Sequence, residues 1–369
     1  MKRMKAAVGL AVVLLCAVIF SAPVRARADG AAASGDLNAD GRLSAADAAL
    51  LLRSYPVGKV AMDTQPDCDL TGNGALSGND ARAMLLFAVG GISDLADFRE
   101  RISTGLCSER LFNRFCYIGT RSDPNGGYHS KNVSVTISSG ETEDSRYFLA
   151  DVYVQDLSCL VTAFAGDAFR GASTTVQNMF DSIDDGIVAM NGDYYSIHVY
   201  GPVIRNGVVY AGHVTRNWDI AVLLDSGELA IYPYRKLTKD ALAGMDVYQT
   251  WVFGPSLLDE TGHAKTKFRS AVQPANPRSV LGYYEPGHYA FLVVDGRTKD
   301  SKGLTMEQLS QLCEDLGFAR AYNLDGGRSS ILLSQTGFIN EPYKGGRTTS
   351  DIIAIRDLPQ TEQQTTETE

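Results

Sequence analysis

A ladder of oxygen-bearing side chains occurs twice near the start of the chain, and the two copies are offset by 33 residues. In each copy, oxygen donors stand at loop positions 1, 3, 5, 9 and 12, and a glycine (Gly41 or Gly74) stands at position 6. With position 7, which offers its backbone carbonyl, the two ladders are Asp36, Asn38, Asp40, Arg42, Ser44 and Asp47, then Asp69, Thr71, Asn73, Ala75, Ser77 and Asp80. This spacing is typical of EF-hand-type loops that bind Ca²⁺ through oxygen ligands. The sequence therefore predicts two calcium loops, and each leads into a short apolar helix pattern, over 48–55 or 81–89.

Position 12 of each loop is the short Asp rather than Glu, and each loop has a helix pattern after it with little sign of one before it. This arrangement, over about residues 34–92, resembles a dockerin, a small all-α module of two loop–helix repeats. The resemblance implies that the module needs two Ca²⁺ ions to fold and that it attaches the chain to a cohesin-type scaffold protein. A docking module of this kind does not supply an activity, which is expected in the rest of the chain.

The first 28 residues have the pattern of a secretory signal peptide. Basic residues at 2, 3 and 5 precede an apolar stretch from 6 to 20, and Ala26-Arg27-Ala28 forms a small-x-small cleavage site. The apolar stretch is shorter than a membrane-spanning helix needs. The protein is therefore predicted to be secreted, and to be extracellular or associated with the cell surface. Removal of the five basic residues in this segment changes the net charge from −9 to −14, which disfavours a nucleic-acid partner.

Five cysteines follow the predicted cleavage site, and an exported protein can form disulfides. Cys107 and Cys116 are close enough in sequence for a local bridge. Cys159 and Cys313 are expected to be small buried hydrophobic residues. The odd number leaves at least one thiol without a partner in the same chain.

Beyond a connector at 93–111, which has a short helical stretch, residues 112–357 are rich in strand patterns. Apolar and polar residues alternate over 133–138, as in a half-buried strand, and 289–294 is a continuous apolar run, as in a buried one. Further strand patterns cover 147–154, 203–210 (a hairpin with an Arg-Asn-Gly turn), 220–224 and 229–232. One helix is well marked, because Thr305 and Gln308 form a capping box before it and Gly317 ends it. The sequence predicts an α+β fold, in which a strand-rich mixed α/β domain follows the small helical module and the polar tail at 358–369 is disordered.

One run near the C-terminus groups chemically active residues. Residues 322–330 read Tyr-Asn-Leu-Asp-Gly-Gly-Arg-Ser-Ser, so an apolar approach leads one carboxylate to a glycine pair. Gly326 and Gly327 tolerate backbone angles that other residues avoid and let a ligand approach the main chain. Asp325 can serve as acid, base or nucleophile, and Arg328 suits an anion. This grouping fits a sugar or phosphate site better than a core.

Four other segments place polar residues directly after apolar ones. They are 189–195 (Ala-Met-Asn-Gly-Asp-Tyr-Tyr), 253–257 (Phe-Gly-Pro-Ser-Leu), 276–282 (Asn-Pro-Arg-Ser-Val-Leu-Gly) and 293–297 (Val-Val-Asp-Gly-Arg). A single Asp-Gly pair is most often only a turn. The set as a whole, at expected strand ends, is typical of a functional site, because sites are built in the loops beyond strands.

In this order, the five segments resemble the phosphodiester glycosidase family, in its bacterial branch. The segments 162–167 (Thr-Ala-Phe-Ala-Gly-Asp) and 346–351 (Gly-Arg-Thr-Thr-Ser-Asp) match the family pattern as well, so the resemblance covers about residues 112–357. It implies an enzyme that hydrolyses the bond between a sugar's anomeric carbon and a phosphodiester phosphate, of the N-acetylglucosamine-1-phosphodiester type. One departure is Arg328, which stands where family members often carry a third glycine.

Such a reaction needs a carboxylate near the anomeric carbon and cations at the departing phosphate. Asp325 is the first candidate for the carboxylate, and Asp193 is the second. Asp295 is either a third candidate or a structural partner of Arg297 or Arg278. Arg278 and Arg297 are the expected phosphate ligands, because a guanidinium fork holds two phosphate oxygens. The full set of expected substrate-binding residues is Asn191, Gly192, Arg278, Arg297, Gly326, Gly327, Arg328, Ser329, Ser330 and Arg347.

Two other functions compete with the enzyme on sequence grounds. The same domain can bind an anionic glycan without turning it over, or the chain can act only as a calcium-dependent docking protein. A serine hydrolase is disfavoured, because no Gly-x-Ser-x-Gly elbow is present. Retention or inversion at the anomeric carbon, and a metal shared by Asp193, Asp295 and Asp325, are left open by the sequence.

Overall fold

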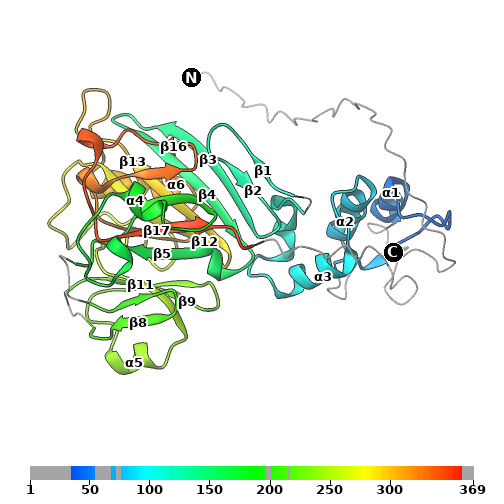
Figure 1. Cartoon of the computed structure of the whole chain (residues 1–369), viewed down its shortest axis with the longest axis horizontal. Helices are drawn as coiled ribbons and strands as arrows, with labels where there is room; N and C mark the ends of the chain where they lie inside the picture. The colour runs from blue at the N-terminus through cyan, green and yellow to red at the C-terminus, as the bar shows by residue number, and fades with distance from the viewer. Residues whose placement is uncertain are drawn as a thin grey trace, which may run out of the picture.

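The computed structural model describes residues 35–54, 68–71, 76–117, 119–196, 201–214 and 217–359. Figure 1 shows a strand-rich body with a small group of helices, α1 to α3, at one side of it. The predicted signal peptide at 1–28 lies outside the described residues, as do the last ten residues of the predicted tail. No helix within the described ranges has both the length and the apolar character that crossing a membrane requires.

Within the described residues, the largest sheet has seven strands in the order β1-β2-β3-β4-β13-β12-β14, and each neighbouring pair is antiparallel. Its strands are β1 (Arg121–Ser122), β2 (Tyr128–His129), β3 (Val133–Glu141), β4 (Arg146–Val154), β12 (Arg278–Glu285), β13 (His288–Val294) and β14 (Arg320–Asn323). The strands expected at 133–138, 147–154 and 289–294 are confirmed as β3, β4 and β13.

The central strand β13 is apolar throughout because both of its faces are buried. Tyr289, Phe291 and Val293 point into one hydrophobic cluster, and the alternate residues Ala290 and Leu292 point into another. A strand with only one buried face alternates apolar and polar residues, whereas a strand between two packed layers does not. The continuous apolar run in the sequence therefore records the position of β13 at the centre of a layered fold.

A second sheet packs against one face of the first. It has five strands among the described residues, in the order β16-β15-β6-β17-β5. They are β5 (Leu160–Phe164), β6 (Gly186–Asn191), β15 (Leu332–Ser334), β16 (Gly337–Phe338) and β17 (Asp351–Arg356). Residues of both sheets share one cluster, in which Val188 and Ile353 pack with Phe291. This interface between sheets is the main core of the molecule.

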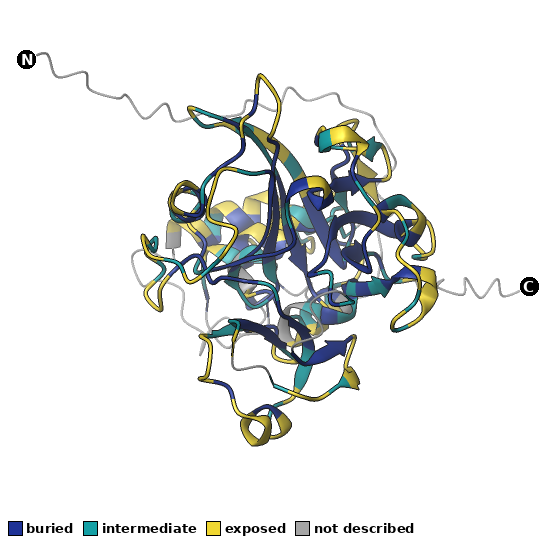
Figure 2. Cartoon of the chain, turned by 90° about the vertical axis from the view of Figure 1, so that its left-hand side faces the viewer, coloured by how far each residue is buried: buried dark blue, intermediate teal, exposed yellow. Residues whose placement is uncertain are grey.

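Helices cover the outer faces of the two sheets. Helix α6 (Met306–Asp315) packs Leu309 and Cys313 against Leu292 of the large sheet, and α4 (Val176–Phe180) packs Met179 against the five-stranded sheet. The expected capping box of α6 is present, with Thr305 as N-cap and Gln308 as its partner. The body therefore has four layers, α-β-β-α, and Figure 2 shows buried strands inside it with exposed loops around them.

Smaller elements complete the body. A three-stranded sheet, counted over the described residues, has the order β10-β9-β11, and a hairpin pairs β7 with β8. The bounds are β7 (Val203–Arg205), β8 (Val208–Ala211), β9 (Ile220–Leu224), β10 (Leu229–Tyr232), α5 (Lys239–Ala243) and β11 (Val247–Trp251). The expected strands at 220–224 and 229–232 and the hairpin at 203–210 are thus confirmed. The α+β, strand-rich character of the domain agrees with the prediction.

The N-terminal helices share one small core. They are α1 (Ala45–Ser54), α2 (Gly78–Ala88) and α3 (Leu95–Thr104), followed by the 3-10 helix η3 (Glu109–Arg114). Leu51 of α1 and Met84 of α2 are in the same cluster as Phe98 of α3 and Phe112 of η3. The segment expected to be a connector with a short helical stretch, 93–111, contains α3, which packs onto the two preceding helices.

Cys107, Cys159 and Cys313 are free thiols. The local bridge considered for Cys107 and Cys116 is not formed, because the Cys107 thiol donates instead to the carbonyl oxygens of Val154 and Gly287, each at 3.4 Å. Cys159 and Cys313 are fully buried, as expected, and burial raises the pKa of both thiols.

Candidate active site at the end of the large sheet

Three charged side chains meet at one edge of the large sheet because of its register. Strand β12 begins at Arg278, which lies opposite Val294 at the end of β13, and Val280 lies opposite Asn323 at the end of β14. Asp325 follows β14 and Arg297 follows β13, so antiparallel pairing brings both beside Arg278. A hollow of about 110 Å³ lies between them. It is lined by Phe253, Val272, Asn276, Arg278, Arg297, Leu324, Asp325, Gly326 and Gly327.

Arg278 is a buried cation without a carboxylate partner among the described residues. Only 2% of the residue is exposed, and its guanidinium donates to the carbonyl oxygens of Leu304, Pro274 and Gln273. Burial, followed by the nearby positive charge of Arg297, lowers the pKa of Arg278 from 12.5 to about 10. An unneutralised buried charge is costly, and a bound anion in the hollow lowers that cost.

Arg297 lies at the more open side of the same hollow. Its Nε and one terminal nitrogen both donate to Asn276 Oδ1, at 3.0 and 2.7 Å, and its guanidinium lies 5.6 Å from the centre of the Tyr343 ring. Within the described part of the chain it makes no ion pair. Two arginines with neutral partners therefore border one small space, which favours a ligand with negative charge.

The carboxylate of Asp325 is held in a fixed orientation. The residue is 5% exposed, and Oδ2 accepts a hydrogen bond from a terminal nitrogen of Arg347 at 2.5 Å. The Nε of Arg347 donates to Ser329 Oγ, and the guanidinium lies 4.7 Å from the centre of the Tyr194 ring. These contacts hold the guanidinium of Arg347 beside the carboxylate of Asp325. A carboxylate held in one orientation at the hollow is suited to attack an electrophilic carbon or to activate water.

Hydrogen bonds from a residue of the second sheet hold the backbone at Asp325 in place. Asn191, at the end of β6, is fully buried, and its Nδ2 donates to the carbonyl oxygen of Asp325 at 2.7 Å. Its Oδ1 accepts from Ser279 Oγ at 2.8 Å and from the backbone N–H of Ile331 at 3.3 Å. Asn191 was expected to contact substrate, whereas these bonds occupy its amide and make it a positioning residue for the loop.

The glycine pair after Asp325 is required by close packing. A Cβ on Gly326 would lie 2.7 Å from the carbonyl oxygen of Pro277. Gly327 has φ +68°, and a Cβ there would lie 3.1 Å from a guanidinium nitrogen of Arg297. Both positions line the hollow. A side chain at either one would displace the loop or the arginine.

Asp193 lies in a different environment from Asp325. It is 1% exposed and, with Asp351, flanks the buried guanidinium of Arg205, with both O···N distances at 3.0 Å. Its oxygens also accept from the backbone N–H groups of Tyr195 and Val252, at 3.1 and 2.7 Å. Burial, and then the charge of Asp193, raise the pKa of Asp351. The Asp193 carboxylate is fully engaged, and it does not line the hollow.

Asp295 is also placed away from the hollow. Asn340 Nδ2 donates to Oδ1 at 2.9 Å, the backbone N–H of Glu341 donates to Oδ2 at 3.3 Å, and a nitrogen of Arg146 lies 3.6 Å from Oδ2. Burial raises the pKa of Asp295. The expected pairing with Arg278 or Arg297 is not formed, because Asp295 turns to a neighbouring loop.

The remaining residues that were predicted to bind substrate include some that do not line the hollow. Arg328 is exposed and donates to the carbonyl oxygen of Gly346 at 2.8 and 3.2 Å, and it is not among the residues that line the hollow. Gly192 packs against Asp351, where a Cβ would lie 2.5 Å from the carboxyl carbon. Ser330 is buried, and its hydroxyl has no hydrogen-bond partner among the described residues.

Several residues around the site were not predicted as site residues. Asn276 and Phe253 line the hollow, Tyr194 supports Arg347, and Arg205 with Asp351 forms the buried ion cluster with Asp193. The sequence pattern placed Arg205 in the turn of a hairpin, where an exposed arginine is common, so it gave no signal of the cluster. Its partners Asp193 and Asp351 are 12 and 146 residues away, so the local pattern did not identify them.

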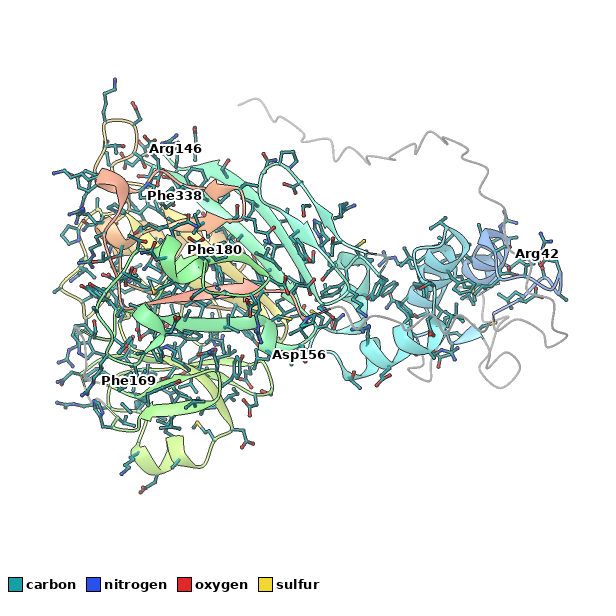
Figure 3. The ribbon with its side chains drawn as sticks, in the orientation of Figure 1. Arg42, Arg146, Asp156, Phe169, Phe180 and Phe338 are labelled. Carbon is teal, nitrogen blue, oxygen red and sulfur yellow. The ribbon has the colours of Figure 1, made fainter. Side chains whose placement is uncertain are left out.

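The two predicted calcium loops repeat one hydrogen-bonding scheme where both are described. Asp47 accepts through Oδ1 from the backbone N–H of Asn38, and through Oδ2 from the N–H and hydroxyl of Ser44. Asp80 does the same with Thr71 and Ser77, the residues 33 positions further along. Asn73 and Ala75 lie outside the described residues. Figure 3 shows Arg42, position 7 of the first loop, on the side of the module away from the strand-rich body.

The side-chain oxygens of the first loop suit a cation that prefers oxygen ligands. In this structure they accept hydrogen bonds from backbone N–H groups of the same loop. Asp36 accepts from the backbone N–H groups of Asp40 and Gly41, and Asn38 Oδ1 accepts from the N–H of Asp40. Over the residues that the structure describes, no three His, Cys, Asp or Glu side chains are arranged to hold a metal ion. Calcium binding therefore stays a prediction.

Comparisons with known proteins match the part of the chain that contains the hollow. The model of the phosphodiester glycosidase family matches residues 184–356. Among curated proteins, the chain is 26% identical over 166 residues to the SPbeta prophage-derived uncharacterized protein YomE of Bacillus subtilis (strain 168). That match covers 43% of this chain, and the chain spans 26% of the length of that relative.

Among solved structures, the catalytic domain of zebrafish N-acetylglucosamine-1-phosphodiester alpha-N-acetylglucosaminidase, auto-inhibited by its pro-peptide, is similar with a TM-score of 0.51. The two chains are 19% identical, and the match covers 65% of this chain and 88% of that one. At this identity the likeness shows a shared fold. Asp325, Arg278, Arg297 and Arg347 all lie within residues 184–356, so the part of the chain that builds the hollow is the part that matches the model of the phosphodiester glycosidase family.

Proposed function

We propose that the strand-rich domain hydrolyses the bond between the anomeric carbon of a sugar and the phosphate of a phosphodiester. One observation carries the proposal: Arg278 and Arg297, neither with a carboxylate partner among the described residues, share one hollow with the carboxylate of Asp325. The family match of residues 184–356 supports a glycosidase-type activity. The zebrafish protein of similar fold is named as acting on an N-acetylglucosamine 1-phosphodiester, so we take that sugar as the first to test.

The charges assign a role to each group. The phosphate lies against Arg278 and Arg297, and the sugar lies with its anomeric carbon toward Asp325. As the C–O bond to the phosphate breaks, positive charge develops on the sugar and negative charge on the departing oxygen. Asp325 stabilises the first charge, as nucleophile or as the base that activates water, and the arginines stabilise the second. Water supplies hydroxyl to the anomeric carbon, the phosphate leaves as a monoester, and one proton is released.

Other residues keep this geometry rather than touch the substrate. Asn191 holds the carbonyl of Asp325, and Arg347 with Ser329 fixes the carboxylate. Asp193 holds the buried guanidinium of Arg205, which supports the loops below the site. We assign these residues positioning roles, since a catalytic carboxylate displaced by about 1 Å loses much of its effect.

The direct test uses the methyl phosphodiester of N-acetylglucosamine 1-phosphate. We expect the full chain to release free N-acetylglucosamine and methyl phosphate in equal amounts, with no inorganic phosphate. Proton NMR during the reaction would show whether the anomeric configuration is retained or inverted. Release of neither product, together with binding of the diester by calorimetry, would favour the alternative function of a non-catalytic binder of anionic glycans.

We also propose that the protein is secreted and that residues 34–92 bind two Ca²⁺ ions and dock onto a cohesin-type partner. The repeated bonding of Asp47 and Asp80 supports two equivalent loops. Calorimetry with CaCl₂ should show two ions per chain, and Asp36→Ala should remove one of them. A calcium-loaded chain that does not bind immobilised cohesin domains would contradict the docking role and leave the calcium sites standing.

A further inference from the structure

A trough continues from the hollow over the three-stranded sheet. A second hollow of about 220 Å³ shares Phe253 with the first, and a third of about 460 Å³ shares Pro233 and Lys265 with the second. One segment, residues 265–278, runs along all three, because Lys265 lines the second and third, Ser270 lines the second, and Val272 lines the first. The site is therefore one end of an extended trough and not an isolated pit.

The second hollow is rich in positive charge. Lys265, Lys267 and Arg269 line it, and in the described part of the chain none of them forms an ion pair. The acidic residue that lines it is Asp219, whose two oxygens accept from the backbone N–H groups of Tyr234 and Ser256, each at 2.9 Å. Three unneutralised cations in one place are notable in a chain of net charge −9, because its charges elsewhere repel an anionic ligand.

Aromatic surface accompanies these cations. The Arg269 guanidinium lies 4.1 Å from the centre of the Tyr234 ring, and Tyr234 is 37% exposed. Phe253 forms the border with the first hollow, and Trp218 lines the second. Aromatic faces pack on sugar rings, and cations bind phosphates, so this lining fits a ligand that alternates the two.

We propose that the trough binds the part of the substrate beyond the scissile phosphate, and that this part is a glycan with repeated phosphodiester links. The inference rests on the proposed function of the first hollow. The scissile phosphate lies between Arg278 and Arg297, the next sugar crosses Phe253, and the next phosphate lies among Lys267 and Arg269. The preferred substrate is thus a polyanionic chain, cleaved from the end whose anomeric carbon faces Asp325.

The test compares two synthetic substrates of N-acetylglucosamine 1-phosphate: the methyl diester, and a trimer joined by phosphodiester links. For the double variant Lys267→Ala/Arg269→Ala, the ratio of kcat/KM on the trimer to that on the methyl diester should fall about fivefold. Arg121→Ala/Lys131→Ala, an equal loss of charge near the β1 edge of the large sheet, should leave the ratio unchanged. A ratio that is the same in the Lys267/Arg269 variant as in the wild type would overturn the proposal.

A binding measurement separates failure of the trough from failure of the enzyme. In Asp325→Asn, which cannot turn the trimer over, calorimetry should give tighter binding of the trimer than of the methyl diester, and adding the Lys267/Arg269 changes should reduce that difference about fivefold. The wild type could cleave neither compound while the trimer still binds more tightly than the methyl diester and loses that advantage in the Lys267/Arg269 variant. This result would refute the proposed activity and support the trough as a binding site. Equal affinity of Asp325→Asn for both compounds would refute the trough whatever the activity.

Discussion

The molecule places the same kinds of side chain, aspartate and arginine, in two contrasting arrangements. In the buried cluster, Arg205 is flanked by Asp193 and Asp351 at 3.0 Å, with no more than 1% of any of the three exposed. In the hollow, Arg278 is almost as deeply buried, but its partners are neutral carbonyls. A cation whose charge is already balanced supports the fold, whereas a cation left without counter-charge beside an opening is suited to bind an anion.

The largest expected effect is a loss of activity, and it distinguishes Asp325 of the hollow from Asp193 of the buried cluster. Asp325→Asn should lower kcat on the methyl diester of N-acetylglucosamine 1-phosphate roughly 10⁴-fold, because it removes the group that faces the anomeric carbon. The melting temperature should stay close to that of the wild type, since the Arg347 partner is partly exposed and can be solvated. Turnover near the wild-type rate in a folded variant would remove Asp325 from the mechanism.

Loss of Arg205 should act on the fold instead. Arg205→Met leaves two buried carboxylates without their cation, so we expect the free energy of unfolding to fall by about 3–5 kcal/mol. Urea denaturation followed by tryptophan fluorescence measures this. An exposed arginine in the same domain, Arg235→Met, serves as the control. A change below about 1 kcal/mol in Arg205→Met, the range of exposed pairs, would show that the cluster is not the support we describe.

Arg278→Met should lower activity strongly and stability little, which is the opposite of what we expect for Arg205→Met. Its kcat/KM on the methyl diester should fall roughly 100-fold, because one of the two groups that stabilise the departing phosphate is gone. Stability should be unchanged or slightly higher, since a buried charge without a counter-ion has been removed. If Arg278→Met unfolds as readily as Arg205→Met, the contrast between the two arginines fails.

The smallest effect tests anion binding without any turnover. Inorganic phosphate at about ten times its dissociation constant should stabilise the wild type by about 1.4 kcal/mol, a rise of a few degrees in melting temperature. The rise should be absent in Arg278→Met and present in Arg235→Met. An equal rise in all three proteins would mean that phosphate acts elsewhere or by a general salt effect.

Much of the fold could be predicted from local sequence patterns, because strands and helix caps depend on residues that are neighbours in the sequence. The strand 220–224, the hairpin at Arg205-Asn206-Gly207 and the capping box of Thr305 and Gln308 were all predicted and are all present. The glycine pair after Asp325, and the meeting of Asp325 with Arg278 and Arg297, also agree with the sequence, since each residue directly follows or begins a strand.

The roles within the site were harder to predict, because they depend on partners that are distant in sequence. Asp193 and Asp325 both follow an apolar strand and adjoin glycine, yet only Asp193 meets a buried arginine, and that arginine comes from the hairpin β7–β8. The role of Asn191 was equally hard to predict, because its amide nitrogen donates to the carbonyl oxygen of Asp325, 134 residues away. Sequence spacing does not encode such pairings.

The most direct test is a crystal structure of Asp325→Asn with the methyl diester of N-acetylglucosamine 1-phosphate bound. We predict that the phosphate contacts the guanidinium groups of both Arg278 and Arg297, and that the anomeric carbon lies next to residue 325. A phosphate bound away from these two arginines, or a sugar with its anomeric carbon turned from residue 325, would contradict the assignment of this hollow as the active site.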